Sequence, residues 1–470
     1  MNRRGFIESV LIGGVARFSR FDALTRPTVR PFTSPPTFDV RDFGARGDGV
    51  SDDSAAIVRA LAAAAVAGGT VIVPTGVYPV QPILHVASGV TLRGEGDKSI
   101  LTRVTGDPIV LASTATHDSA IQDLAITGQF AHGVLLDKCS RVRVSRCHVS
   151  GATSARFGYG NGVFIVGSNG ITIDECRFRA NGGEGFRGAD IQCDGLGQRS
   201  RDIRIENNDC LSVDVAVNIL CYDTSGSLIH KNVVSGARIR GAQNHGYGIL
   251  VYATQANQDA CFDNAISDNS ISHTEGSGIY LAGCNRSRVI NNVIQDVANA
   301  QEDFSLPVGA IALNQSQYVT IEGNQISGAG RAGISLASNR QGVGHVTVRR
   351  NVIANVGGYG IDLRGLLEDI RVTANTVSRT NGGIGTDRDD VQDSIVVSDN
   401  ILNAISARGG IKLRNAGRST VERNTLTDCD GYAVDLTFRD AVSTAGDNVV
   451  RQTSASSNRA AARIRVDRRK

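Results

Sequence analysis

Two aspartates stand in consecutive stretches of alternating apolar and polar residues, Asp190 in 189–194 and Asp214 in 213–218. If these stretches stack as neighbouring strands, ~4.8 Å apart and offset by about one residue pair, the two backbones lie about 8 Å apart. Carboxyl groups about 6.5–9.5 Å apart suit inverting glycoside hydrolysis, in which one protonates the leaving oxygen and the other activates water. Crowding raises the pKa of one carboxyl, which then serves as the acid. His245 lies near the following stretch and completes the catalytic candidates.

The same alternation predicts which side chains face outward beside these candidates, because residues i and i+2 of a strand share a face. The predicted substrate-binding residues are Gln192, Asp194, Asn218, Asp223, Tyr252, Tyr280 and Asn314. Several repeats between 147 and 324 are longer than the basic unit of about 24 residues. Insertions in a repeat protein map to loops on one face. We therefore expect a walled groove over roughly residues 161–315.

An asparagine between aliphatic residues recurs along the chain and indicates how these stretches are positioned. The late copies are 27, 24, 25, 24 and 24 residues apart, at Asn324, Asn351, Asn375, Asn400, Asn424 and Asn448. Such a period fits one coil of a solenoid whose coils stack at the strand spacing, so that identical positions align. An asparagine at a tight turn tolerates left-handed backbone angles and can satisfy buried backbone groups. The sequence therefore predicts an all-β fold, a right-handed parallel β-helix, with a capping helix within 51–67 for which Ser51 is the expected N-cap.

Two early segments carry a family resemblance. Residues 39–57, DVRDFGARGDGVSDDSAAI, and residues 68–78, GGTVIVPTGVY, resemble the opening of the pectate-lyase-like superfamily. That group includes polygalacturonases, rhamnogalacturonases, alginate epimerases and phage tailspike enzymes. The resemblance implies a parallel β-helix and a polysaccharide or oligosaccharide substrate. The regions around Asp190, Asp214 and His245 follow the order of the polygalacturonase motifs, which favours a glycoside hydrolase.

A second activity class remains open, namely a uronate polysaccharide lyase or C5-epimerase. Residues 359–364, YGIDLR, resemble the Tyr-Gly-Phe-Asp-Pro-His motif of alginate epimerases, with Arg364 in place of His and Leu363 in place of Pro. Such chemistry needs a cation to neutralise the uronate carboxylate and a base to remove the C5 proton. Charged residues follow this motif on the predicted outward face: Asp362, Arg364, Asp387, Lys412, Arg414 and Asp435. The competing interpretation is a solvated ladder of alternating charge. A third class is a non-catalytic carbohydrate-binding or adhesion solenoid.

The chain divides into four predicted parts. Residues 1–36 are a leader and linker, 37–105 an N-terminal cap with the first coils, 106–450 the β-helix and 451–470 a basic tail. The start Asn2-Arg3-Arg4-Gly5-Phe6-Ile7, followed by an apolar stretch, resembles a twin-arginine export signal. It predicts a periplasmic or extracellular location. A net charge of +6 in the tail predicts a solvated, frayed end.

Composition excludes several partners. Residues 1–30 have a net charge of +4, so with a total of +3 the body between the two basic ends has a net charge of −7. The body contains no stripe of basic and aromatic residues that would indicate nucleic-acid binding. The sequence contains no apolar run of 18 residues, so no membrane span is predicted. The nine cysteines contain no CxxC pair, so no cofactor or structural metal is predicted, while calcium bound by loop aspartates stays open. Cys147 and Cys176 are expected on adjacent coils, as a disulfide or as part of a reduced inward stack.

Overall fold

The computed structural model describes the chain in segments separated by short gaps. The described residues are 35–81, 83–103, 108–113, 115–153, 160–182, 188–195, 198–213, 215–238, 246–254, 261–299, 308–338, 342–451 and 463–468. Contacts divide the chain into Met1–Pro35 and Pro36–Lys470, and all helices and strands below lie in the second unit.

Three faces of parallel strands form the solenoid, as the repeat predicted. The first face consists of β4 (Leu84–His85), β6 (Val110–Ala112), β8 (His132–Asp137), β11 (Asn161–Val166), β14 (Ala189–Asp194), β18 (Val217–Tyr222), β22 (Tyr247–Tyr252), β25 (Ile279–Ala282), β28 (Gly309–Asn314), β31 (Ala332–Ala337), the later parts of β33 (Val352–Arg364) and β35 (Thr376–Gly385), β38 (Ile411–Gly417), β41 (Tyr432–Phe438) and β44 (Arg463–Arg468).

The second face follows the first in each turn. It consists of β1 (Thr37–Asp39), β2 (Gly69–Ile72), the early parts of β5 (Val90–Arg103) and β7 (His117–Gly128), β9 (Ser140–Ser145), β12 (Thr172–Asp174), β16 (Arg204–Glu206), β20 (Leu228–His230), β23 (Ala265–Ser267), β26 (Arg288–Ile290), β29 (Thr320–Glu322), β32 (Val343–Arg349), β34 (Leu367–Thr373), β36 (Gln392–Ser398), β39 (Thr420–Glu422) and β42 (Thr444–Gly446). Beside it, β15 (Ser200–Arg201) pairs with β19 (Thr224–Ser225).

The third face closes each turn. It consists of β3 (Gly76–Pro79), the later parts of β5 and β7, β10 (His148–Ser150), β13 (Arg177–Arg179), β17 (Asp209–Cys210), β21 (Val233–Ser235), β24 (Ser270–Ser272), β27 (Val293–Gln295), β30 (Gln325–Ser327), the early parts of β33 and β35, β37 (Ile401–Ile405), β40 (Thr425–Cys429) and β43 (Val449–Arg451). Aliphatic side chains from all three faces form one continuous buried core along the solenoid. The nine cysteines are buried thiols, as the inward stack predicted.

The predicted asparagine ladder stands between the second and third faces. From Asn208 to Asn448, each Nδ2 donates to the Oδ1 of the asparagine in the next turn at 2.9–3.0 Å. The left-handed backbone angle belongs to the residue before each asparagine and not to the asparagine itself, for example Lys231 at φ 53° and Ala374 at φ 55°. The asparagine side chain thus satisfies the backbone groups that this turn leaves unpaired.

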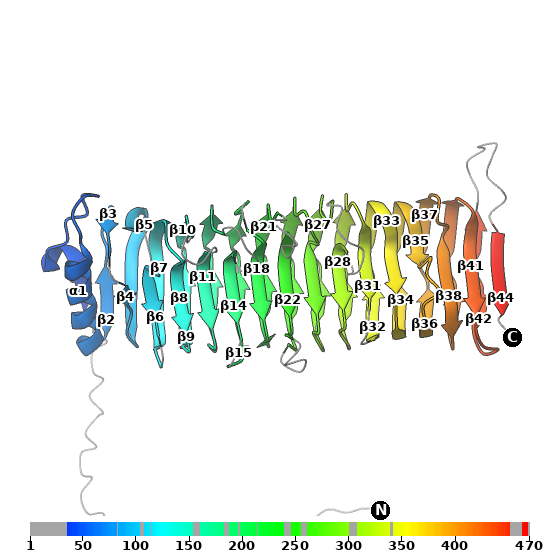
Figure 1. Cartoon of the computed structure of the whole chain (residues 1–470), viewed down its shortest axis with the longest axis horizontal. Coiled ribbons are helices and arrows are strands. Elements are labelled where there is room, and N and C mark those ends of the chain that lie inside the picture. Colours follow the sequence, from blue (N-terminus) through cyan, green and yellow to red (C-terminus); the bar gives the residue numbers. More distant parts are fainter. Residues whose placement is uncertain are drawn as a thin grey trace, which may run out of the picture. The chain divides into compact units, whose positions relative to one another are not determined.

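The ends of the solenoid differ from the expectation in two details. Helix α1 (Ser54–Ala67) follows a short 3-10 helix, η1 (Val40–Phe43), and buries Ile57 and Leu61 against the first coils. The predicted N-cap at Ser51 was wrong, because Asp53 occupies the N-cap position and the helix begins at Ser54. At the other end, residues 463–468 of the basic tail pair with β41 as β44 rather than fraying. Figure 1 shows α1 in blue and β44 in red, with the turns between them in chain order.

Candidate functional site

Asp190, the first catalytic candidate, faces the interior of the solenoid. It belongs to a row of the first face in which most turns have glycine. A Cβ added at Gly248 of that row would lie 2.9 Å from Ile271 Cγ2, and one at Gly278 would lie 2.7 Å from Ile294 Cγ2. Both isoleucines belong to the core, so the row points inward. The turn of Asp190 has the smaller Cys210 at the position aligned with Ile271, which leaves room for a carboxylate.

A buried polar network surrounds the Asp190 carboxylate. Its Oδ1 accepts hydrogen bonds from Asn181 Nδ2 at 3.1 Å and from Ser212 Oγ, and its Oδ2 accepts one from Asn218 Nδ2 at 3.1 Å. Asp190 and Asn218 are fully buried, and this burial raises the pKa of Asp190. The outward orientation predicted for both residues was wrong, because the chain bends at the start of each first-face strand and turns two consecutive residues inward. Asp214 and His245 lie outside the described residues.

Most of the other predicted groove residues lie on two outward rows, and apolar and aromatic side chains pack along these rows. The register aligns Gln192 with Leu220, Leu250 and Tyr280 in one row, while Tyr252 and Asn314 belong to the next. Tyr280 stacks on Tyr247 with ring centroids 4.9 Å apart.

Most of these polar side chains are therefore held by neighbours. Asn314 Nδ2 donates to the Tyr280 hydroxyl at 3.3 Å, and burial raises the pKa of Tyr280 to about 12. Gln192 and Asp194 are buried, whereas Tyr252 is partly exposed and packs edge-on against Tyr222. The Asp223 carboxylate accepts hydrogen bonds from Thr254 N and Thr254 Oγ1, both at 2.9 Å, and therefore closes a turn.

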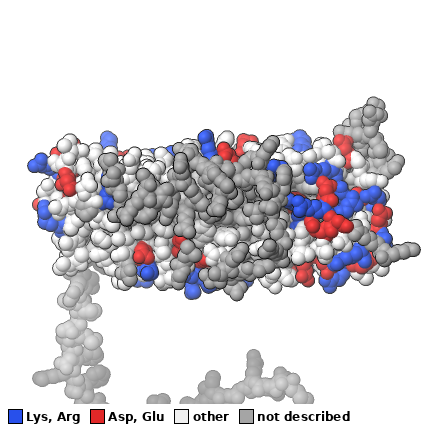
Figure 2. Space-filling model, viewed as in Figure 1, with Lys and Arg blue, Asp and Glu red and all other residues white. Residues whose placement is uncertain are grey.

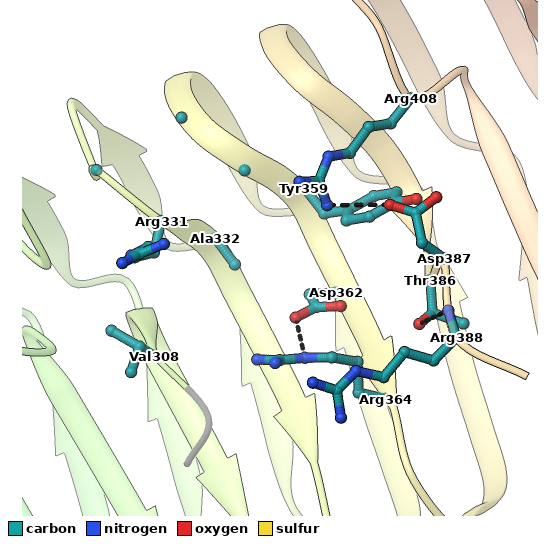
Figure 3. A pocket seen from close by; sticks show the side chains of 13 residues that line it. Val308, Arg331, Ala332, Tyr359, Asp362, Arg364, Thr386, Asp387, Arg388 and Arg408 are labelled. Carbon is teal, nitrogen blue, oxygen red and sulfur yellow. Dashed lines mark hydrogen bonds and ion pairs between the residues drawn. The ribbon is translucent and has the colours of Figure 1, made fainter. Parts of the chain in front are cut away.

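A cavity of about 250 Å³ lies farther along the same face, over β33 and β35. Its lining residues are Val308, Gly330, Arg331, Ala332, Gly357, Gly358, Tyr359, Asp362, Arg364, Thr386, Asp387, Arg388 and Arg408. Figure 3 shows two groups of charged side chains in it, Tyr359 with Asp387 and Arg408, and Asp362 with Arg364 and Arg388. The motif at 359–364 therefore lines a partly open cavity. The expectation of a merely solvated charge ladder was wrong, because Asp362 and Asp435 are each less than a tenth exposed.

The first group joins a phenol to a fixed carboxylate. Asp387 Oδ1 lies 2.6 Å from Lys412 Nζ and its Oδ2 lies 3.0 Å from Arg408 Nη1, while the Arg408 guanidinium lies 5.5 Å from the centre of the Tyr359 ring. Burial alone would raise the pKa of Asp387, but the contacts with Lys412, Tyr359 and Arg408 outweigh it and lower that pKa. Burial, followed by the negative charge of Asp387, raises the pKa of Tyr359. The Tyr359 hydroxyl is buried beside Asp387 and makes no well-aligned hydrogen bond to a described residue, so Asp387 is the charged group that influences it most directly.

The second group contains a carboxyl that titrates near neutral pH. Burial raises the pKa of Asp362 to about 6, although the positive charges of Arg364, Arg388 and Arg408 act in the opposite direction. Arg364 Nε lies 2.5 Å from Asp362 Oδ2, without the alignment of a hydrogen bond, and Arg364 Nη2 donates to Ser335 Oγ at 3.3 Å. A carboxyl with this pKa can accept or donate a proton at neutral pH.

The motif resemblance identified Tyr359, Asp362 and Arg364, and the row of alternating charge included Asp362, Arg364 and Asp387. The sequence reasoning missed Arg331, Arg388 and Arg408. Arg331 and Arg408 each stand just before the Ala-Gly-Ile or Gly-Gly-Ile start of a first-face strand, which is the signal that could have found them. Among the described residues, no cluster of His, Cys, Asp and Glu could hold a metal ion, and no helix has the length and apolar character needed to cross a membrane.

Comparisons with known proteins give relatives for parts of the chain. Mannuronan C5-epimerase AlgE1 of Azotobacter vinelandii is 31% identical over 172 residues, which cover 32% of this chain and 11% of that protein. Alginate lyase 7 of the same organism is 37% identical over 107 residues, covering 19% and 12%. The chain thus spans a small part of the length of these relatives. The A-module of mannuronan C-5 epimerase AlgE6 of the same organism has a similar fold, with a TM-score of 0.53 and 18% identity over 88% of this chain and 99% of that module.

Two family models cover most of the solenoid. A model described as "Rhamnogalacturonase A/epimerase, pectate lyase-like" matches residues 37–244. A model described as "Right handed beta helix region" matches residues 217–392 and 309–465, which together make up more than half of the chain. The chain therefore belongs to the right-handed parallel β-helix superfamily.

Proposed function

We propose that this protein acts on a uronate-containing polysaccharide by removing the proton at C5 of a uronate residue, as C5-epimerases and polysaccharide lyases do. The observation that carries the proposal is the cavity that brings Tyr359 together with Asp362 and several arginine side chains. The C5-epimerase and alginate-lyase names of the sequence relatives support the same chemistry. The paired-aspartate hydrolase lacks comparable support, because Asp190 lies in the interior.

The cavity supplies the three groups that this reaction needs. Arg364 and Arg388 can neutralise the uronate carboxylate and so stabilise the negative charge that develops when the C5 proton leaves. Asp362, with a pKa of about 6, is mostly ionised at neutral pH and can take that proton. Tyr359, whose pKa is raised, keeps its own proton at neutral pH and can donate it.

The two outcomes differ only in where the second proton goes. In epimerisation, Tyr359 protonates C5 from the opposite face and no bond in the polymer breaks. In elimination, the electrons of the C5–H bond form a C4=C5 double bond, the C4–O bond breaks, and the tyrosine proton goes to the leaving oxygen. Asp387, held by Lys412 and Arg408, fixes the tyrosine in either case.

The test is turnover of polymannuronate, polyguluronate and polygalacturonate in D₂O, followed by proton NMR and ultraviolet absorbance. Deuterium at C5 with an altered uronate ratio and unchanged chain length identifies an epimerase, and a new unsaturated uronate identifies a lyase. Tyr359→Phe removes only the hydroxyl and is expected to lower turnover about 10²–10⁴-fold.

Tyr318→Phe is the matched control, since Tyr318 is 56% exposed and stacks on His345 away from the cavity. Its turnover is expected to equal that of the wild type. New reducing ends without unsaturation would favour hydrolysis. Retention of a polymer without any change would favour a binding solenoid. Either result contradicts the proposal.

A further inference from the structure

The arrangement around Tyr359 occurs a second time, three turns closer to the C-terminus. Residues 432–437, YAVDLT, align in register with 359–364, YGIDLR, through β35 and β38. In both copies, a tyrosine begins the strand and an aspartate follows three residues later on the outward row. The second copy adds Asp435 and Tyr432 to the surface next to the cavity.

In the second copy, too, an arginine lies over the tyrosine ring, although it comes from the next turn. The Arg465 guanidinium lies 4.7 Å from the centre of the Tyr432 ring, as Arg408 lies over Tyr359. Asp435 is bound from two sides, by Arg414 Nη2 at 2.7 Å and by Arg465 Nε at 2.7 Å. One nearly buried carboxylate thus fixes two guanidinium groups, each of which retains N–H groups that Asp435 does not use.

The strand that completes this cluster comes from the basic tail. Arg465 lies on β44, which pairs with β41 residue by residue, including Asp435 with Arg465. Its side chain is 37% exposed, and Tyr432 is partly exposed beneath it. The cluster therefore presents a partly exposed cation to solvent, with the Tyr432 ring partly covered by it.

Charge on the two outward rows is asymmetric about the cavity. On the N-terminal side, the aligned positions are uncharged: Ala312, Asn314, Ser335 and Ala337. From β35 onward, the described first-face cations Arg408, Lys412, Arg414 and Arg465 outnumber by one the three aspartates that pair with them, Asp387, Asp435 and Asp467. Figure 2 shows these charges gathered over the last turns of the solenoid. The excess of positive charge favours an anionic ligand on this side.

We infer that Tyr432, Asp435, Arg414 and Arg465 form a distal subsite for a second uronate residue of the polymer bound in the cavity. Three turns correspond to about 14 Å at the strand spacing. A 1→4-linked pyranose advances its chain by a length close to one such spacing, so the subsite receives the residue about three units from the reacting one. The polymer then runs from the cavity toward the C-terminal end, with a carboxylate at Arg465 and the sugar ring beside the partly exposed Tyr432. This inference rests on the proposed function for the identity of the ligand.

The experiment measures binding of three-residue and six-residue uronate oligomers by calorimetry, in a Tyr359→Phe background that removes turnover. A trimer at the cavity does not reach the subsite, whereas a hexamer does. Arg465→Gln is expected to reduce the affinity for the hexamer about five- to tenfold and to leave the affinity for the trimer unchanged. Arg465→Lys keeps the charge and is expected to retain most of the advantage of the hexamer. Arg451→Gln is the matched control, because Arg451 is exposed on the third face.

The subsite would be overturned if Arg465→Gln left the ratio of the hexamer affinity to the trimer affinity unchanged. An equal loss of hexamer affinity in Arg451→Gln would overturn it as well. Turnover of the polymers by the wild type tests the proposed function separately. If the wild type changes no uronate polymer while the length effect depends on Arg465, the proposed function fails and the subsite stands. If turnover occurs without the length effect, the function stands and the subsite fails.

Discussion

Replacing Asp190 tests whether its carboxylate stabilises the fold or takes part in catalysis. Four donor contacts converge on its two oxygens, from Asn181 Nδ2, Ser212 Oγ, Ser212 N and Asn218 Nδ2. In Asp190→Asn, one oxygen becomes an amide that cannot accept, so two buried donors lose their partner. Each such loss costs about 1–3 kcal/mol.

Part of this cost is recovered in the variant, because the buried carboxylate, whose pKa burial raises, is replaced by a neutral group. We therefore expect Asp190→Asn to lower the free energy of unfolding by about 2–4 kcal/mol, a large share of a typical 5–15 kcal/mol. Turnover per folded molecule should equal that of the wild type, since Asp190 does not line the cavity.

The assay is denaturant unfolding followed by circular dichroism, together with turnover measured well below the unfolding midpoint. Asp362→Asn is the complementary variant, because Asp362 lines the cavity and Asp190 does not. It should abolish most turnover while changing the unfolding midpoint less than Asp190→Asn does. Loss of turnover in Asp190→Asn at an unchanged midpoint would refute the interior role and restore the paired-aspartate hypothesis.

Three further results are expected. Turnover should rise as the pH increases through about 6, because the base Asp362 must be ionised. Arg364→Gln should move this rise of the pH–rate profile to higher pH, because the substitution removes a cation that lowers the pKa of Asp362. A rise at the same pH in the variant would contradict the role of Asp362. Asn375→Ala should cost about 2–6 kcal/mol in unfolding free energy, because the backbone amide of Asn351, the preceding ladder residue, and the Val348 carbonyl each lose a partner. Asn403→Ala on the exposed side should change the unfolding free energy by less than about 1 kcal/mol, and equal unfolding midpoints for the two variants would rule out this ladder contribution. The nine buried thiols should react with a thiol reagent only after denaturant is added, and rapid labelling of the folded protein would show that the stack is accessible.

Sequence reasoning predicted the fold because the determinants of a solenoid are local and periodic. The spacing of Asn324, Asn351 and Asn375 gives the length of a turn, and the aliphatic residues beside them give the buried face of each strand. Stacking then requires no long-range information, since each turn packs on its neighbours. The capping helix followed in the same way from its alanine-rich composition, although its first residue did not.

Sequence reasoning failed where alternation stops at a bend. Ala189 belongs to the outward cluster, whereas Asp190 and Ile191 both face the interior. Strict alternation assigns neighbouring residues to opposite faces, so it gives the wrong orientation for either Asp190 or Ile191. The glycine of most other turns marks this bend, because a Cβ there would collide with the core. The recurring Gly-Ile pair was visible in the sequence. Whether the first residue of that pair must be glycine depends on the core residue that it faces, which the sequence does not show.

By itself, the sequence determined the stacked coils, the asparagine ladder and the outward charges around Asp362. Periodicity is sufficient for these features, because neighbouring turns impose the same environment on each equivalent position. Only the tertiary structure decided that Asp190 is buried and hydrogen-bonded in the interior, whereas Tyr359 lines a cavity. Burial and pairing depend on side chains from turns 22 to 49 residues apart, such as Ser212 for Asp190 and Arg408 for Tyr359, and no local pattern specifies those contacts.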